Sequence, residues 1–157
     1  MHSRGVTRRA VLTVAGTVGA ASVAGCLGSD PDHGVFDDVE FVDDEPDYDG
    51  WLDDAVTHEG TVDRTGEQEV TVLVGTGEEG MGFGPAAIRV DAGTTVVWEW
   101  TGEGGVHDVV HTDREFESEG KLNAGATFSH TFEEPGTYAY SCRPHERRGM
   151  KGAVDVV

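Results

Sequence analysis

The sequence predicts an all-β domain, an antiparallel sandwich or barrel of Greek-key type. Its 157 residues include 23 glycines and only 37% hydrophobic residues, a balance that suits a turn-rich β domain better than a helical bundle. Short segments of alternating apolar and polar residues recur along the chain, and turn residues separate them. No long amphipathic helical pattern is visible, so helices are not expected to build the core.

The first expected strand covers residues 69–74, where Val70, Val72 and Val74 alternate with polar residues. Later segments share its β-branched and aromatic character, and further strands are expected at residues 87–90, 94–100, 106–111, 126–132, 136–142 and 152–157. Turn sequences separate several of them, at residues 91–93, 101–105 and 134–136. Several short strands separated by such turn sequences favour an antiparallel sandwich or barrel.

The N-terminus has the layout of an export signal. Arg8 and Arg9 precede an uncharged run over residues 10–25, as in a twin-arginine signal. A permanent transmembrane helix is the alternative, but this run is shorter than the ~20 apolar residues that cross a bilayer. The run ends in a sequence that resembles a lipobox, which implies a lipid anchor on Cys26. The other interpretations of Cys26 are a free thiol or a disulfide with Cys142.

Residues 1–25 are therefore predicted to be a twin-arginine lipoprotein signal peptide, with the mature protein lipid-anchored at the extracytoplasmic face of the cell membrane. Residues 26–49 are rich in acidic residues, glycine and proline and are expected to form a flexible tether. Scattered aromatic residues such as Phe41 and Tyr48 indicate an alternative, in which a short N-terminal strand docks on the domain. The folded domain is expected at residues 50–157.

The charge of the chain excludes one class of partner. The formal net charge is -19, and after residue 25 the chain carries 8 basic against 30 acidic residues, or -22. Such a body repels phosphate backbones, so nucleic acid is not an expected partner. The same acidity suits a protein that stays hydrated in concentrated salt, where charges are screened over only ~3 Å at about 1 M. An acidic protein from a low-salt organism is the alternative.

Metal-ligating residues gather near the C-terminus. Cys142, His145 and Met150 place a thiolate, an imidazole and a thioether within nine residues. Thiolate and imidazole suit copper, zinc and iron, whereas a weak axial methionine beside two histidines and a cysteine is typical of copper electron-transfer sites. His107, after a Gly-Gly pair and at the start of an expected strand, is the best candidate for the second histidine. His111 is the next candidate, but it lies roughly 13 Å further along an extended strand.

Residues 140–156 closely resemble the copper loop of plastocyanin-like cupredoxins, with the same Cys-x₂-His-x₄-Met spacing. Within that family the chain is most similar to the halocyanin group. Further segments support the resemblance over most of residues 47–157, and they lie at residues 48–53, 94–105 and 131–138.

The resemblance implies an eight-stranded cupredoxin sandwich that holds one copper ion through His107, Cys142, His145 and Met150. It implies a mobile carrier of single electrons that alternates between Cu(I) and Cu(II), and not an enzyme. In such a protein His145 would be the electron port and Met150 the weak axial ligand. The implied partners are redox proteins of a membrane respiratory chain, and we expect a monomer.

Two residues beside the expected ligands depart from the family pattern. Asp108 follows His107 where many relatives have asparagine, and Arg143 follows the thiolate in place of a small hydroxyl side chain. The two side chains that usually form a hydrogen bond between these positions are therefore absent from this sequence. We expect Asp108 and Arg143 to form an ion pair across the site that takes over this role.

Other functions remain as alternatives. A zinc-binding or metal-free domain of the same fold would use the same segments. A copper enzyme needs a further open centre, for which His58, His111 and His130 are too few and too dispersed. A copper chaperone or store favours exchangeable Met- and His-rich surfaces, yet only Met81 and Met150 remain after the signal.

Overall fold

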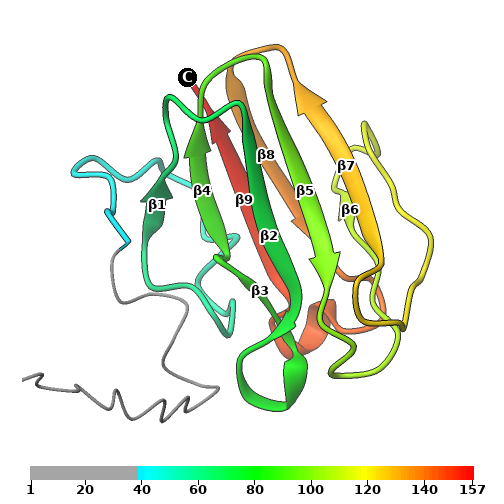
Figure 1. The fold of residues 1–157 in the computed structure, drawn as a ribbon. Helices are drawn as coiled ribbons and strands as arrows, with labels where there is room; N and C mark the ends of the chain where they lie inside the picture. The colour runs from blue at the N-terminus through cyan, green and yellow to red at the C-terminus, as the bar shows by residue number, and fades with distance from the viewer. Residues whose placement is uncertain (1–38) are drawn as a thin grey trace, which may run out of the picture.

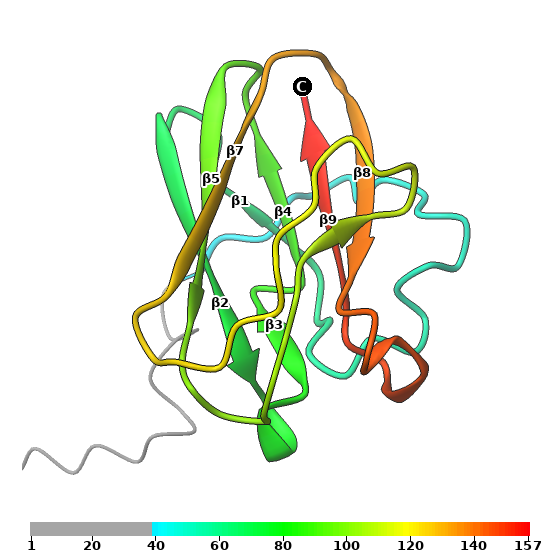
Figure 2. The same ribbon diagram turned by 90° about the vertical axis from the view of Figure 1, so that its right-hand side faces the viewer.

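The computed structural model describes residues 39–157, which form two facing β-sheets (Figure 1). The elements of this part of the chain are β1 (Thr61–Asp63), β2 (Glu69–Thr76), η1 (Glu78–Gly80), β3 (Gly82–Gly84), β4 (Ala87–Val90), β5 (Thr94–Trp100), β6 (Val110–His111), β7 (Thr127–Phe132), β8 (Gly136–Ser141), η2 (Glu146–Arg148) and β9 (Lys151–Val156). One sheet has the order β1-β4-β9-β8-β6 and the other β3-β2-β5-β7, which Figure 2 shows as two separate layers. The prediction of an all-β sandwich is confirmed.

Strands β2 and β5 show why these segments form a half-buried sheet. Val72 lies opposite Trp98 in their pairing, and both side chains are fully buried. Along β5 the residues alternate between buried positions and partly or fully exposed ones, with Val96, Trp98 and Trp100 pointing inward. This period of two matches the pleat of a strand, so the expected segments 69–74 and 94–100 are confirmed as strands.

The strand pairing is mixed, so the prediction of a purely antiparallel fold is wrong. Three pairs are parallel, β1 with β4, β4 with β9 and β2 with β5. The cause is the route of the chain, which passes from β2 and β3 in one sheet to β4 in the other and back to β5. Strands that are neighbours in a sheet are therefore often not consecutive in sequence. The described residues also hold nine strands where the family resemblance implied eight.

The strand expected at residues 106–111 is mostly absent. Only Val110 and His111 belong to a strand, β6, which pairs with the end of β8. His107 instead forms an isolated antiparallel bridge with Lys121, in which each residue donates its backbone N–H to the other's carbonyl, at 3.0 and 2.8 Å. The position of His107 is thus fixed by backbone pairing, although not within a continuous strand.

Aromatic side chains fill the space between the sheets. Trp98 is fully buried, and its ring centroid lies 5.3 Å from that of Tyr140 and 5.5 Å from that of Phe116. Cys142 and Met150 belong to the same hydrophobic cluster. Large aromatic residues provide most of the apolar area that stabilises a small domain. The expected metal-binding loop is thus attached directly to the core.

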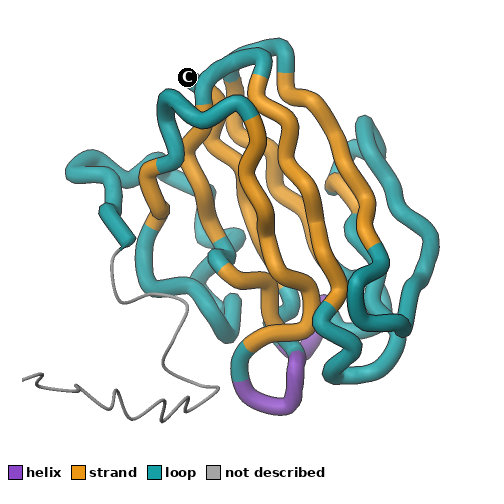
Figure 3. The backbone as a smooth tube through the Cα atoms, in the orientation of Figure 1, coloured by secondary structure: helices purple, strands orange, loops and turns teal. Residues whose placement is uncertain are grey.

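The loops that matter for function meet at one end of the sandwich. β5 and β8 run toward this end, where η1 and η2 also lie, and Figure 3 shows both short helices there in purple. The segment that follows β5 carries His107, and the segment that follows β8 begins with Cys142. Two distant parts of the chain therefore reach the same end of the fold.

Residues 39–49 lie against the domain. Phe41 forms a bridge with Val62, and the hydroxyl of Tyr48 hydrogen-bonds that of Thr61 at 2.7 Å. This docking agrees with the alternative for the aromatic residues of the expected tether over residues 26–49. The signal at residues 1–25 and Cys26 lie outside the described residues and stay predictions. No helix within residues 39–157 is long and apolar enough to span a membrane.

Candidate metal centre

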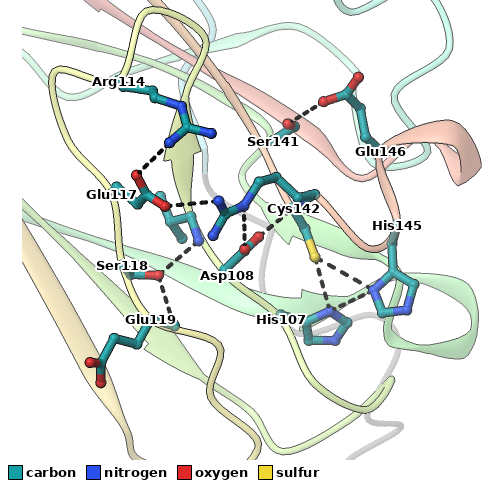
Figure 4. Close-up of polar contacts among 12 residues, drawn as sticks. His107, Asp108, Arg114, Glu117, Ser118, Glu119, Ser141, Cys142, His145 and Glu146 are labelled. Carbon is teal, nitrogen blue, oxygen red and sulfur yellow. Dashed lines mark hydrogen bonds and ion pairs between the residues drawn. The ribbon is translucent and has the colours of Figure 1, made fainter.

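Three potential ligand atoms converge at the end of the sandwich. Sγ of Cys142 lies 3.6 Å from Nδ1 of His107 and 3.5 Å from Nδ1 of His145, and the two imidazole nitrogens lie 3.1 Å apart (Figure 4). His107 and Cys142 are fully buried, whereas His145 is partly exposed. The structure thus brings together three of the four residues expected to bind a metal, from segments 35 positions apart.

The orientation of the His107 ring is set by its surroundings. Nε2 lies 2.8 Å from the carbonyl oxygen of Glu103 and donates to it, because a carbonyl can only accept. The other ring nitrogen, Nδ1, then carries no proton and directs its lone pair toward Cys142. The carbonyl of His107 also accepts a hydrogen bond from the indole N–H of Trp100 at 3.1 Å. Backbone, ring and tautomer of His107 are therefore all arranged for metal binding.

The loop after β8 closes on itself through backbone hydrogen bonds. The N–H of Cys142 donates to the carbonyl of Met150 at 3.1 Å, and the N–H of Met150 donates to the carbonyl of His145 at 3.3 Å. Helix η2 ends at Arg148, and the next residue, Gly149, has a φ of 87° in the left-handed region. Glycine adopts this conformation without strain, so the chain can turn sharply into β9.

Met150 is fully buried at the end of this turn. It belongs to the same hydrophobic cluster as Cys142, and their backbones are joined by the hydrogen bond that closes the loop. The loop therefore keeps the backbone of Met150 next to that of Cys142, and its buried thioether is a candidate donor for a soft metal ion.

Burial determines the protonation of the metal-free site. It raises the pKa of the Cys142 thiol to about 11, so that the thiol is protonated at neutral pH. Burial also lowers the pKa of His107, which favours the neutral imidazole that a metal requires. A metal ion that binds the thiolate must therefore displace one proton from Cys142.

The expected ion pair beside the site is present. The carboxylate of Asp108 accepts hydrogen bonds from both the backbone N–H and Nε of Arg143, each at 2.8 Å. Glu117 extends the pair, because its carboxylate lies 2.8 Å from Nη1 of Arg143. The sequence did not indicate Glu117, which lies in a segment without a motif. Its partner Arg143 was recognisable only as a departure from the family pattern.

The other histidines within residues 39–157 lie away from the cluster. The His111 ring stacks on Phe116, with 5.0 Å between centroids, and its Nδ1 accepts a hydrogen bond from a backbone N–H. His58 pairs with Glu45 at 3.2 Å, and His130 packs against Phe116. These packing contacts agree with the expectation that His58 and His130 are not ligands. His111, the next candidate for the second histidine, is not part of the cluster.

The donor set fits a copper ion. A zinc ion forms bonds of about 2.0 Å to nitrogen and about 2.3 Å to sulfur. At near-tetrahedral angles, a nitrogen and a sulfur bound to one such ion lie about 3.5 Å apart. The separations around Cys142 meet this requirement without rearrangement. One thiolate, two imidazoles and a neighbouring thioether form the set that favours copper over zinc, because zinc gains little from a thioether.

A two-sheet sandwich with two histidines, a cysteine and a methionine at one end defines the class of small blue copper proteins. Comparisons with known proteins agree with this class. The family model for copper binding proteins of the plastocyanin/azurin family matches residues 70–157. Halocyanin of Natronomonas pharaonis is 46% identical over 164 residues, which cover 95% of this chain and 96% of that protein.

Plastocyanin of Scenedesmus fuscus is 36% identical over 98 residues, which cover 56% of this chain and 99% of that protein. Among solved structures, a purple cupredoxin from Nitrosopumilus maritimus is 29% identical, with a TM-score of 0.48 over 56% of this chain and 99% of that chain.

The chain belongs to the plastocyanin/azurin family of copper-binding proteins. The resemblance to the halocyanin group is likewise confirmed. The protein is a type 1 copper electron carrier with one copper ion, and it is not an enzyme.

Proposed function

We propose that the protein carries single electrons between redox proteins of a respiratory chain at the extracytoplasmic face of the cell membrane. Its copper would be held by His107, Cys142, His145 and Met150. The observation that carries this proposal is the buried cluster of His107, Cys142 and His145, whose ligand atoms all lie within 4.8 Å of one another. Two of these three residues, His107 and Cys142, are fully buried, as suits a centre that exchanges electrons and not a bound substrate.

The bound copper would supply a one-electron couple between Cu(I) and Cu(II). The role of the polypeptide is to keep the ligands in one arrangement in both oxidation states. His107 is held by its bridge to Lys121 and by the carbonyl of Glu103, and Cys142 directly follows β8. Ligands fixed in this way need little rearrangement when an electron arrives or leaves, which favours fast transfer.

His145 is the proposed electron port, because it alone among the three clustered residues is partly exposed. The charge of its surroundings differs from that of the whole chain. The loop over residues 142–151 carries Arg143, Arg147, Arg148 and Lys151 against one acidic residue, in a chain of net charge -19. Three of these four cations pair with carboxylates from other segments, so this end is closer to neutral than the chain as a whole, and an acidic redox partner would meet less repulsion here.

The N-terminal features support the proposed location. Arg8 and Arg9 with the uncharged run after them fit twin-arginine export, and Cys26 fits a lipid anchor. Residues 26–49 would link this anchor to the domain at residues 50–157, with the segment from residue 39 onward lying against the domain. A single anchored copy would suffice, because each chain holds a complete ligand set, so we propose a monomer.

Voltammetry separates the carrier from a copper chaperone or store. The purified protein loaded with copper should give a reversible one-electron wave, and it should not transfer its copper to a metal-free acceptor protein. An absent or irreversible wave together with ready transfer of copper would reverse the assignment. A Cys142→Ser variant, which lacks the thiolate, is the control and should lose the wave.

Membrane attachment is tested separately in cells. A Cys26→Ser variant should move from the membrane fraction to the soluble extracytoplasmic fraction, whereas replacement of Arg8 and Arg9 by lysine should keep the chain inside the cell. If the Cys26→Ser variant remains in the membrane fraction, the lipid anchor is not what attaches the protein.

A further inference from the structure

A segment outside the family match contacts the copper loop. The family model matches from residue 70 onward, whereas residues 50–57, here called the strap, precede β1. The strap contacts the chain on both sides of Met150, at Gly149 in the loop and at the first two residues of β9. Figure 2 shows the chain of this region, in cyan to teal, along the side of the molecule that carries β8 and β9.

The first contact involves Gly149, the residue before Met150. The backbone N–H of Val56 donates to the carbonyl of Gly149 at 3.0 Å. A Cβ atom at Gly149 would overlap the carbonyl oxygen of Asp54 and lie 2.9 Å from Cγ1 of Val56. The backbones of strap and loop are therefore in direct contact, and only glycine fits between them.

The second group of contacts involves the two residues after Met150. The indole N–H of Trp51 donates to the carbonyl of Gly152 at 3.0 Å. The ammonium group of Lys151 lies 2.7 Å from Oδ1 of Asp54 and 4.7 Å from the centroid of the Trp51 ring. The Lys151 side chain is only 15% exposed, which makes this ion pair and cation–π contact stronger than at an open surface.

The strap is itself fixed to the domain. Leu52 is 4% exposed and packs in one cluster with Ala87 of β4 and Ala153 of β9. At the other end of the strap, the hydroxyl of Thr57 donates to the carbonyl of Phe83 at 2.6 Å. The strap is therefore attached to both sheets, and its contacts with the loop restrain the loop relative to the sheets.

We infer that the strap is a positioning element that holds Met150 at the copper. The inference rests on the proposed ligand role of Met150. A weak axial thioether contributes little bonding energy, so the polypeptide must impose its position. His107 and Cys142 are fixed by backbone pairing and by β8, whereas the residues on both sides of Met150 are fixed by Trp51, Asp54 and Val56.

The test removes polar contacts of the strap and keeps its shape. Trp51→Phe retains an aromatic ring but no N–H donor, and Asp54→Asn retains the size but not the charge. The matched control is Tyr48→Phe with Asp53→Asn, because Tyr48 bonds Thr61 and not the loop, and Asp53 has no ion-pair partner within residues 39–157. All proteins are purified with copper bound.

The double variant at Trp51 and Asp54 should lose copper to a chelator severalfold faster than the control. Its reduction potential should rise, because a loosened thioether stabilises Cu(II) less, and the ratio of its visible sulfur-to-copper bands should change. After removal of copper, the double variant and the double control should unfold at similar temperatures. A potential and spectrum equal to those of the parent, or equal shifts in the control, would overturn the inference.

Asp54→Asn alone, at a side chain that is 60% exposed, provides the same test if the double variant does not fold. Its expected shift in potential has the same sign. A parent protein without a reversible copper wave would defeat the proposed function itself, whereas a normal parent wave with unchanged variants defeats only the role of the strap.

Discussion

Asp108 accepts two hydrogen bonds from Arg143, one from the backbone N–H and one from Nε, and both measure 2.8 Å. The Asp108 side chain is 7% exposed, whereas that of Arg143 is 45% exposed. The carboxylate therefore lies inside the protein, next to His107, and the guanidinium covers it from outside. This pair connects the residue after one proposed ligand to the residue after another, across 35 positions of sequence.

Replacement of Asp108 by asparagine should raise the reduction potential. Asparagine can still accept the backbone N–H of Arg143, but a negative charge that favours Cu(II) is lost. We expect a shift of the order of 1 kcal/mol, about 40 mV for one electron. Voltammetry measures it, and Arg143→Gln should shift the potential in the opposite direction. Unchanged potential and copper retention in Asp108→Asn would show that the pair is not a tether.

Replacement of Gly104 by alanine should disrupt the site, whereas the same change at Gly105 should not. Both glycines have positive φ values, 77° and 89°, so both variants bear a backbone cost of about 1–2 kcal/mol. Only at Gly104 would the new Cβ overlap the carbonyl oxygen of Gly80 and lie 2.7 Å from Nε2 of His107. Chelator competition should show at least ~tenfold weaker copper binding for Gly104→Ala. Equal affinities for the two variants would contradict this account of His107.

Replacement of Met150 should change the reduction potential without abolishing copper binding. Leucine removes a donor that stabilises Cu(II), so Met150→Leu should have a higher potential than the parent. Glutamine supplies a harder oxygen donor, so Met150→Gln should have a lower potential. Both variants should remain coloured, because the thiolate of Cys142 is retained. Identical potentials in all three proteins would mean that Met150 does not approach the copper.

Copper affinity should increase with pH. Burial raises the pKa of Cys142 to about 11, so below this pH copper binding must displace a proton from the thiol. The apparent affinity should therefore rise by about tenfold per pH unit between about pH 7 and pH 9. His107 adds no such dependence in this range, because burial lowers its pKa. An affinity that is constant over this range, measured by chelator competition, would show that the thiol is already ionised.

The sequence indicated the long strands well and the short ones poorly. β2 and β5 were recognisable because several β-branched or aromatic residues alternate in each. β1 and β3 hold three residues each and show no period, and the parallel pairs depend on the route of the chain between sheets. Local pattern carries no information about that route, so the antiparallel prediction was wrong.

The copper loop was predictable because Cys142, His145 and Met150 are close in sequence. The choice of His107 depended on its position at the start of an expected strand and on the family resemblance. In the structure His107 is held by the bridge to Lys121 and by the hydrogen bond to the Glu103 carbonyl. Both contacts use backbone groups of the partner residue, so the types of the partner residues do not predict them. The contacts of Trp51 were equally hidden, although the residue lay in a segment that supported the resemblance.

The central claim is that Cys142 and the two clustered histidines bind one copper ion together. The most direct measurement is the visible absorption spectrum of the oxidised protein after addition of one equivalent of copper. The account predicts an intense blue thiolate-to-copper band that disappears on reduction and is absent in Cys142→Ser. A colourless oxidised protein that retains its copper would contradict the claim.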